Sequence, residues 1–175
     1  MARGNRKLGR PTDQRLAILR NQTTDVILHG KIETTESRAK EVKSIVDSII
    51  ALAIKEKDNF EMADVKVVRT KLDSKGKKET EKVTSKNGKE YYRVVKEETT
   101  ENRQKDLPSR LHARRRIMTK INKVKDKDGK NIDLTAKLFG EIAEKYKDNT
   151  GGYTRIVRMG SRRGDSAEKV ILQLI

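Results

Sequence analysis

The sequence predicts an α+β fold, because helical and strand patterns are both present in one short chain. Four stretches repeat apolar residues at helical spacing, and several shorter ones are rich in Val, Ile, Thr and Tyr. Only 33% of the 175 residues are apolar and 3% are aromatic. We therefore expect a small aliphatic core under a large surface.

The first 59 residues predict a basic arm, two helices and a short link. Residues 1–10 carry four cations, two glycines and no acidic residue, which is typical of a flexible basic arm. A first helix is expected over 13–29, with Thr12 as its N-cap and Gly30 at its end. "KIETT" (31–35) predicts a strand or extended connector. The following helix begins near residue 36 and has one apolar stripe: Ala39, Val42, Val46, Ile49, Ile50 and Ala53.

Residues 60–106 differ in composition and predict an inserted antiparallel β-meander. They contain 13 basic and 10 acidic residues, with valines and tyrosines in short runs. "KVTSKNGKEYYRVV" predicts a hairpin in which Asn87 and Gly88 form a tight type I′ turn. With "VKVVRTKL" before it, three strands in sequential pairing are expected.

The C-terminal part returns to helices and then to strands. "LPSRLHARRRIMTKINK" (107–123) predicts a helix with Leu107, Leu111 and Met118 facing inward. Another helix is expected over 132–147, with Leu134, Leu138, Ile142 and Tyr146 on one face. "YTRIVRM" and "AEKVILQLI" predict two strands joined by a glycine-bracketed loop. The expected organisation is an arm (1–10), one domain from 11–59 and 107–175, and an insertion (60–106).

The charge balance indicates a polyanionic partner. Lys and Arg number 42 against 26 Asp and Glu, a net charge of +16, and residues 107–175 alone hold 17 against 8. A membrane surface is the weaker candidate, because no apolar run is long enough to span a bilayer. With no signal peptide and no cysteine, we expect a cytosolic protein.

Catalysis, metal binding and cofactor binding are not expected. The two histidines, His29 and His112, lie at a helix end and in an arginine-rich helix, and neither has a partner nucleophile in the pattern. "GSRRGD" lacks the spacing of a nucleotide-binding loop. Separate arginine clusters without a helix-turn-helix or zinc signature favour folded RNA over DNA.

Five blocks of the sequence resemble the bacterial large-subunit ribosomal protein L17 family: "RKLGRPTDQRLAILRN", "IETTESRAKEV", "LHARRR", "KLFGEIAEKY" and "GGYTRIVRMGSRRGD". The resemblance covers residues 1–59 and about 107–175. It implies helices packed on one face of a small mixed β-sheet and a structural, non-enzymatic role in binding rRNA. The implied partners are the 23S rRNA and neighbouring large-subunit proteins near the exit-tunnel periphery, with no membrane and no small-molecule substrate.

The resemblance also indicates which residues face rRNA. Carried over by matched block, and completed with Arg3 of the arm and Arg158 of the closing block, the nucleic-acid-binding candidates are Arg3, Arg6, Lys7, Arg10, Arg15, Arg20, Arg38, Arg114, Arg115, Arg155, Arg158, Arg162 and Arg163. Asp165 is expected to orient the last loop, by capping backbone N–H groups or by pairing with an arginine.

Two questions stay open at this level. Common family members connect the second helix to "LHARR" by a shorter link, so the insertion is either a contact with rRNA or a neighbouring protein, or a tolerated surface elaboration. The alternative function is a non-ribosomal RNA- or DNA-binding architectural protein. An RNA-modifying enzyme would need an acid-base or cofactor site that the sequence does not contain.

Overall fold

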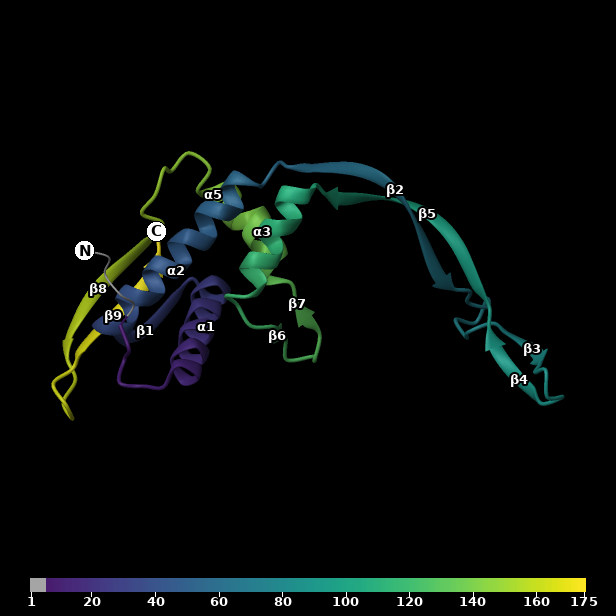
Figure 1. Ribbon diagram of the computed structural model, residues 1–175, viewed down its shortest axis with the longest axis horizontal. Helices are drawn as coiled ribbons and strands as arrows, with labels where there is room; N and C mark the ends of the chain where they lie inside the picture. Colours follow the sequence, from purple (N-terminus) through teal and green to yellow (C-terminus); the bar gives the residue numbers. More distant parts are fainter. Residues whose placement is uncertain (1–5) are drawn as a thin grey trace. The chain divides into compact units, whose positions relative to one another are not determined.

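The computed structural model describes residues 6–175, and its backbone forms two units (Figure 1). The first contains the residues through Asn59 together with Leu107–Ile175, and the second is Phe60–Asp106. The α+β class is confirmed. The predicted basic arm lies partly outside the described residues, which begin at Arg6.

The first unit is built on a three-stranded sheet in the order β1–β9–β8. β1 (Lys31–Thr35) pairs with β9 (Glu168–Leu174), which also pairs with β8 (Thr154–Ser161). Both pairings are antiparallel, so the expected mixed sheet is corrected to an antiparallel one: β8 and β9 form a hairpin, and β1 adds to its edge in the opposite direction to β9. Helices α1 (Thr12–His29) and α2 (Glu36–Lys55) contact this sheet.

Burial alternates along the strands, as expected for a sheet with one covered face. Thr34, Thr154, Val170 and Leu172 are buried, whereas Arg155 and Val157 on the other face are exposed. The covered face carries the buried Val170 and Leu172 together with two buried threonines, and the open face carries Arg155 together with the exposed Val157. The buried residues of β9 mark the side of the sheet that the helices cover.

The α2 stripe predicted from the sequence is confirmed, because all six of its residues are buried. α1 begins at Thr12, one residue earlier than expected, so its N-cap is Pro11 and not Thr12. Gly30 ends α1 in the left-handed conformation (φ 78°), and its N–H donates to the Val26 carbonyl at 2.8 Å. A residue with a Cβ would be strained there.

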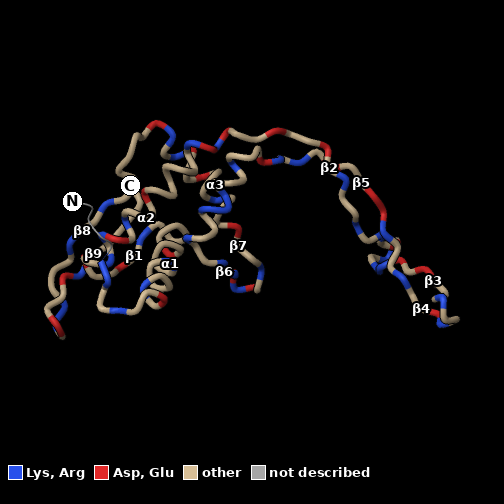
Figure 2. The backbone as a smooth tube through the Cα atoms, viewed as in Figure 1, with Lys and Arg blue, Asp and Glu red and all other residues tan. Residues whose placement is uncertain are grey.

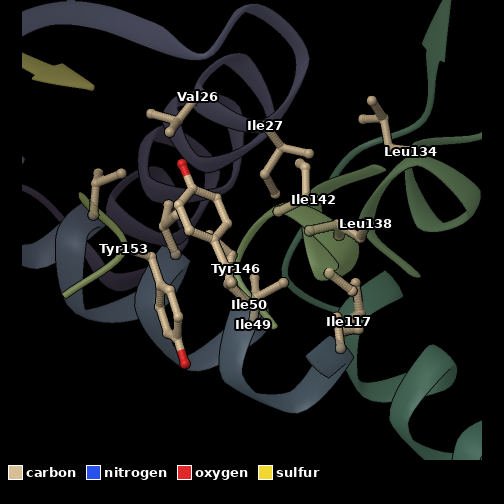
Figure 3. Packing of buried hydrophobic residues seen from close by; sticks show 14 of the residues in the cluster. Val26, Ile27, Ile49, Ile50, Ile117, Leu134, Leu138, Ile142, Tyr146 and Tyr153 are labelled. Atoms are coloured by element: carbon tan, nitrogen blue, oxygen red, sulfur yellow. The ribbon is translucent and has the colours of Figure 1, made fainter. Parts of the chain in front are cut away.

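The segment 132–147 is interrupted by a wider turn. It runs as α4 (Leu134–Lys137), a π-helical turn η1 (Leu138–Ile142) and α5 (Ala143–Lys145). Leu134, Leu138, Ile142 and Tyr146 are buried as predicted (Figure 3). The Tyr146 ring meets Tyr153 edge-on, with centroids 5.6 Å apart. A short hairpin of β6 (Val124–Lys125) and β7 (Asn131–Ile132) precedes this segment.

Helix α3 (Pro108–Met118) has a different buried face from the predicted one. Leu111 and Met118 are exposed and Leu107 is half-buried, while the buried residues are Arg110, Ala113 and Ile117. The reason is an aromatic contact: the Arg110 guanidinium lies 4.9 Å from the centroid of the buried Phe139 ring. Arg110 therefore occupies a buried position on α3 where apolar periodicity predicts a residue such as Leu or Met.

The second unit consists of two nested antiparallel pairs, so the predicted meander is wrong. β2 (Phe60–Thr70) pairs along its whole length with β5 (Lys96–Asp106), and β3 (Thr80–Thr84) pairs with β4 (Glu90–Val94). The predicted β3–β4 hairpin is confirmed. Its turn has a positive φ at Gly88 but not at Asn87, which excludes the expected type I′ turn. The second unit contributes no residue to the hydrophobic core defined over residues 6–175.

Candidate nucleic-acid interface

A polar cleft of about 210 Å³ joins two of the predicted site residues, Arg38 and Arg162. We call it the Arg38–Arg162 cleft. It lies in the first unit, between α1, the β1–α2 junction and the start of β9. Its lining residues are Gln22, Glu33, Thr34, Thr35, Arg38, Arg162, Ala167 and Lys169.

Strand register assembles this cleft from segments that are far apart in the sequence. β1 passes into α2 without a loop, so Thr35 and Glu36 stand at the end of the sheet. Thr35 is the register partner of Lys169, and Ser161 is the partner of Glu168. The loop after β8, which carries Arg162, is thereby brought beside the first turn of α2.

The N-terminus of α2 adds positive potential to the cleft. α2 is 20 residues long, and the side chain of Thr35 at its N-cap makes no capping hydrogen bond. The first N–H groups of a helix have no partner within the helix, and together with the helix dipole they attract anions. Arg38 lies on this first turn. Cationic side chains and backbone donors therefore converge on one end of α2.

The loop of residues 162–167 holds Arg162 in a defined position. Arg162 Nε donates to Asp165 Oδ1 at 2.8 Å, and its NH2 group donates to Oδ2. Asp165 Oδ1 also accepts from the Ala167 N–H at 3.2 Å, so both expected roles of Asp165 are confirmed. Two backbone hydrogen bonds of 2.9 Å close the loop: the Arg162 N–H donates to the Ala167 carbonyl, and the Ser166 N–H donates to the Arg162 carbonyl. Of the five N–H donors of Arg162, Asp165 engages only two.

We expect the Asp165 carboxyl to titrate far below its ordinary range. The hydrogen bond from Arg162, followed by that from the Ala167 N–H, lowers its pKa from 3.8 to about 2. Any stability that the pair gives the loop is present above the ordinary pKa and is lost as the pH falls through about 2. Carboxyl NMR titration should show this value, and Arg162→Ala should move it back toward 3.8. A midpoint near 3.8 in the unaltered chain would contradict the pairing.

The remaining walls of the cleft contain one ion pair and one unused acceptor. Lys169 Nζ lies 2.7 Å from Glu33 Oε2. Gln22 Nε2 donates to Thr34 Oγ1 at 2.9 Å, while the buried Gln22 Oε1 has no hydrogen-bond partner within residues 6–175. The Gln22 carbonyl oxygen therefore lies beneath the wall of the cleft and not on its surface.

Two further predicted residues lie at this end of α2. Arg158 NH2 is 3.4 Å from Glu36 Oε1, and Arg6 Nε is 3.8 Å from Glu41 Oε1. Lys40 first, and then Arg158, lower the pKa of Glu36. Arg15 donates to the Arg6 carbonyl at 3.5 Å. Figure 2 shows Lys and Arg along β8 and in the loop that follows it.

The α3 arginines form a second group, which differs in burial. Arg114 NH1 donates to Thr135 Oγ1 at 3.4 Å, and its guanidinium carbon is 5.6 Å from the Phe139 centroid. Arg115 is exposed. Arg110, which is not among the residues predicted from the sequence, is only 5% exposed and stacks on the same ring. Its spacing of i, i+3 from Ala113 and i, i+7 from Ile117, which puts it on the same helix face as these two residues, was the available signal.

The other predicted site residues are not gathered at the cleft. They are exposed: Lys7, Arg10, Arg20, Arg155 and Arg163. The Arg10 side chain donates a hydrogen bond to Gln14 Oε1 at 3.4 Å. Arg155 projects from the open face of the sheet. Arg3 lies outside the described residues.

Residues 6–175 contain neither a metal-binding cluster nor a membrane span. No group of three or more Asp, Glu or His side chains there could hold a metal ion. No helix in the same part of the chain is both long and apolar enough to cross a membrane.

Comparison with known proteins identifies relatives along nearly the whole chain. The family model described as ribosomal protein L17 matches residues 18–175. The large ribosomal subunit protein bL17 of Ruminiclostridium cellulolyticum is 59% identical over 172 residues, covering 98% of this chain and 99% of the relative. The bL17 protein of Acetivibrio thermocellus is 56% identical over 170 residues, covering 97% and 98%. That of Clostridium acetobutylicum is 37% identical over 175 residues, covering both chains completely.

These alignments run through the insertion as well as the flanking segments. Coverage of 97% or more of this chain leaves no room for the omission of residues 60–106. In these relatives the link between α2 and α3 is therefore not the shorter one expected of common family members.

Proposed function

The chain belongs to the ribosomal protein L17 family, and on that premise we propose how it binds the RNA of the large ribosomal subunit. As a member of this family it is a structural protein of the large subunit, which in bacteria is cytoplasmic. We propose that the Arg38–Arg162 cleft receives a phosphate of the rRNA backbone. The chain carries out no catalysis in this role.

The observation that supports a phosphate is the combination of donors at one end of α2. An arginine presents a planar fork of N–H groups that matches phosphate oxygens, and Arg38 and Arg162 both line the cleft. The uncapped first turn of α2 adds backbone N–H groups to the same space. Because Asp165 fixes Arg162 and the helix fixes the N–H groups of α2 before binding, these groups lose little conformational entropy when a phosphate enters.

Membership of the ribosomal protein L17 family supports rRNA as the polyanion that supplies this phosphate. The Gln22 carbonyl oxygen is buried beneath the wall of the cleft, and its amide nitrogen donates to Thr34 Oγ1, so Gln22 supports the wall and is not proposed as an RNA contact.

The other predicted residues extend this contact along the RNA. Arg6 and Arg158 flank the cleft, where Glu41 and Glu36 orient them. The remaining members of the proposed rRNA-facing set are Arg3, Lys7, Arg10, Arg15, Arg20, Arg114, Arg115, Arg155 and Arg163. The proposed RNA is the 23S rRNA, and the proposed protein neighbours are large-subunit proteins near the exit-tunnel periphery.

Stoichiometric retention in salt-washed large subunits tests the structural role. We expect one copy of the chain per subunit after a wash at high salt, as measured by quantitative mass spectrometry. A structural component buried against folded RNA resists such washing, whereas a loosely attached RNA-binding protein is released by salt. Substoichiometric recovery beside other large-subunit proteins would contradict the role and would favour a non-ribosomal RNA-binding protein.

A further inference from the structure

The second unit consists of two parts that differ in charge. The first is a two-stranded ribbon of β2 and β5, residues 60–70 and 96–106, with five Lys and Arg against six Asp and Glu. The second, which we call the tip, comprises residues 71–95 and has eight Lys and Arg against four Asp and Glu. All the excess positive charge of the unit is therefore in the tip.

The ribbon separates the tip from the residues where the chain enters and leaves the unit. Phe60 pairs with Asp106 at one end of the ribbon, and Thr70 pairs with Lys96 at the other. Eleven residues per strand give a length of about 35 Å at roughly 3.3 Å per residue. Cross-strand ion pairs, such as Lys105 with Glu61 at 3.1 Å, occupy the ribbon's own cations.

Three segments meet in a closed set of backbone hydrogen bonds at the base of the tip. Lys71 N–H donates to the Val95 carbonyl, Val95 N–H to that of Glu79, and Glu79 N–H to that of Lys71, at 2.9–3.0 Å. Two turns project from this junction. One is closed by the bridge between Leu72 and Lys78, and the other joins β3 to β4. The tip is therefore ordered by its own backbone.

The cations of the tip are exposed, and most have no ion-pair partner. Lys71 pairs with Glu79 at 2.8 Å and Lys82 with Glu90 at 2.5 Å. Within the second unit, all of which is described, the other six make no ion pair within 4.0 Å: Lys75, Lys77, Lys78, Lys86, Lys89 and Arg93. Both turns carry lysines from this set.

Two tyrosines lie on opposite faces of the β3–β4 hairpin. Tyr92 is 73% exposed and stands opposite Lys82, and Tyr91 is 49% exposed and stands opposite Val83. Aromatic faces between lysines are the combination that binds single-stranded nucleic acid, because any base can stack on the ring while the cations hold the phosphates. An acidic protein surface would use the cations but would not require exposed aromatic rings.

We propose that the tip is a second, independent RNA-binding surface that grips an unpaired rRNA segment between its lysine-bearing turns and stacks a base on Tyr92. A two-stranded ribbon without a covering layer is only marginally stable in water, so a bound surface also explains how the unit is maintained. The inference rests on the chain's place in the large subunit. It does not depend on the Arg38–Arg162 cleft.

Ultraviolet crosslinking of purified large subunits, followed by mass spectrometry, tests this surface. We expect nucleotide adducts on peptides from residues 71–95, with Tyr92 as the principal site. The ribbon peptides, which contain no tyrosine, should remain unmodified. Adducts confined to the first unit, or crosslinks from the tip to protein alone, would overturn the proposal while leaving the cleft proposal intact.

A matched pair of variants tests the same surface by the salt dependence of rRNA binding. The tip variant changes Lys75, Lys77, Lys86 and Lys89 to Gln, and the ribbon variant changes Lys66, Arg69, Arg103 and Lys105 to Gln, so each removes four positive charges. Binding of the full chain to large-subunit rRNA should show a log–log salt slope about 3 smaller for the tip variant, because each neutralised phosphate of a single strand contributes roughly 0.7 to the slope. The ribbon variant should keep the original slope. Equal slopes in the two variants would contradict a tip-specific contact.

Discussion

Replacement of both Arg38 and Arg162 by Gln is expected to weaken binding of the chain to large-subunit rRNA by about 100-fold. Each arginine is proposed to make charge-assisted hydrogen bonds to the same phosphate, and loss of such bonds costs about 1.5 kcal/mol per arginine at the low end. Filter binding or interferometry at several salt concentrations measures both the affinity and its salt dependence. The log–log slope should fall by about 0.7–0.9 because one phosphate is no longer neutralised.

The matched control removes the same charge from the ribbon. Arg69 contacts Glu101, as does Arg103 at 2.7 Å, so Arg69→Gln with Arg103→Gln should leave the affinity within about threefold. Circular dichroism should show an intact fold in both double variants, since Arg38 and Arg162 lie outside the core. If both pairs weakened binding equally, net charge and not the cleft would account for the affinity.

Phe139→Ala is expected to lower the free energy of unfolding of the first unit by about 3–5 kcal/mol. Phe139 is 3% exposed, and its ring supports the guanidinium groups of Arg110 and Arg114. The substitution leaves a cavity and also removes the aromatic face from the buried Arg110, which adds to the cost. Denaturant unfolding followed by circular dichroism measures the change.

Phe60→Ala is the control, because Phe60 is the other phenylalanine of the chain and is 38% exposed in the second unit. It should alter the unfolding of the first unit by less than about 1 kcal/mol. A loss below about 1 kcal/mol for Phe139→Ala would mean that α3 and η1 do not share a core. Phe139→Leu, which keeps most of the volume but not the ring, should fall between the two.

Apolar periodicity in the sequence correctly predicted the buried faces of helices that pack through apolar side chains. The α2 stripe and the buried face of residues 134–146 are confirmed, because a wide apolar stripe can only face the core. The α3 face could not be predicted in this way. Arg110 shares a helix face with Ala113 and Ile117, but it is buried through its contact with Phe139, which lies on a later helical segment. The local pattern of α3 therefore cannot show what covers this face.

The topology of residues 60–106 shows a different limit. The β3–β4 hairpin is encoded locally by Asn87 and Gly88, and it formed as predicted although its turn type differs. The pairing of β2 with β5 joins the two ends of the insertion, and no turn signal specifies that register. Pairing of strands that follow one another in the sequence was the simpler expectation. Instead, backbone hydrogen bonds among Lys71, Glu79 and Val95 join the β2–β5 pair to the β3–β4 hairpin.

The sequence predicted which residues belong to the candidate site, but it did not predict which of them lie close together in the folded protein. Resemblance to the family supplied Arg38 and Arg162 separately. Their meeting depends on the register of Thr35 with Lys169, which only the folded sheet provides. The sequence could not predict that the N-terminus of α2 is uncapped. Thr35 is a residue type that commonly caps helices, but its side chain makes no capping hydrogen bond.

The most direct test of the phosphate cleft is a high-resolution cryo-electron microscopy map of salt-washed large subunits that contain this chain. We expect density for one rRNA phosphate in the Arg38–Arg162 cleft, within about 3 Å of both guanidinium groups and of the first N–H groups of α2. A cleft that faces solvent, or that is filled by a protein side chain, would contradict it.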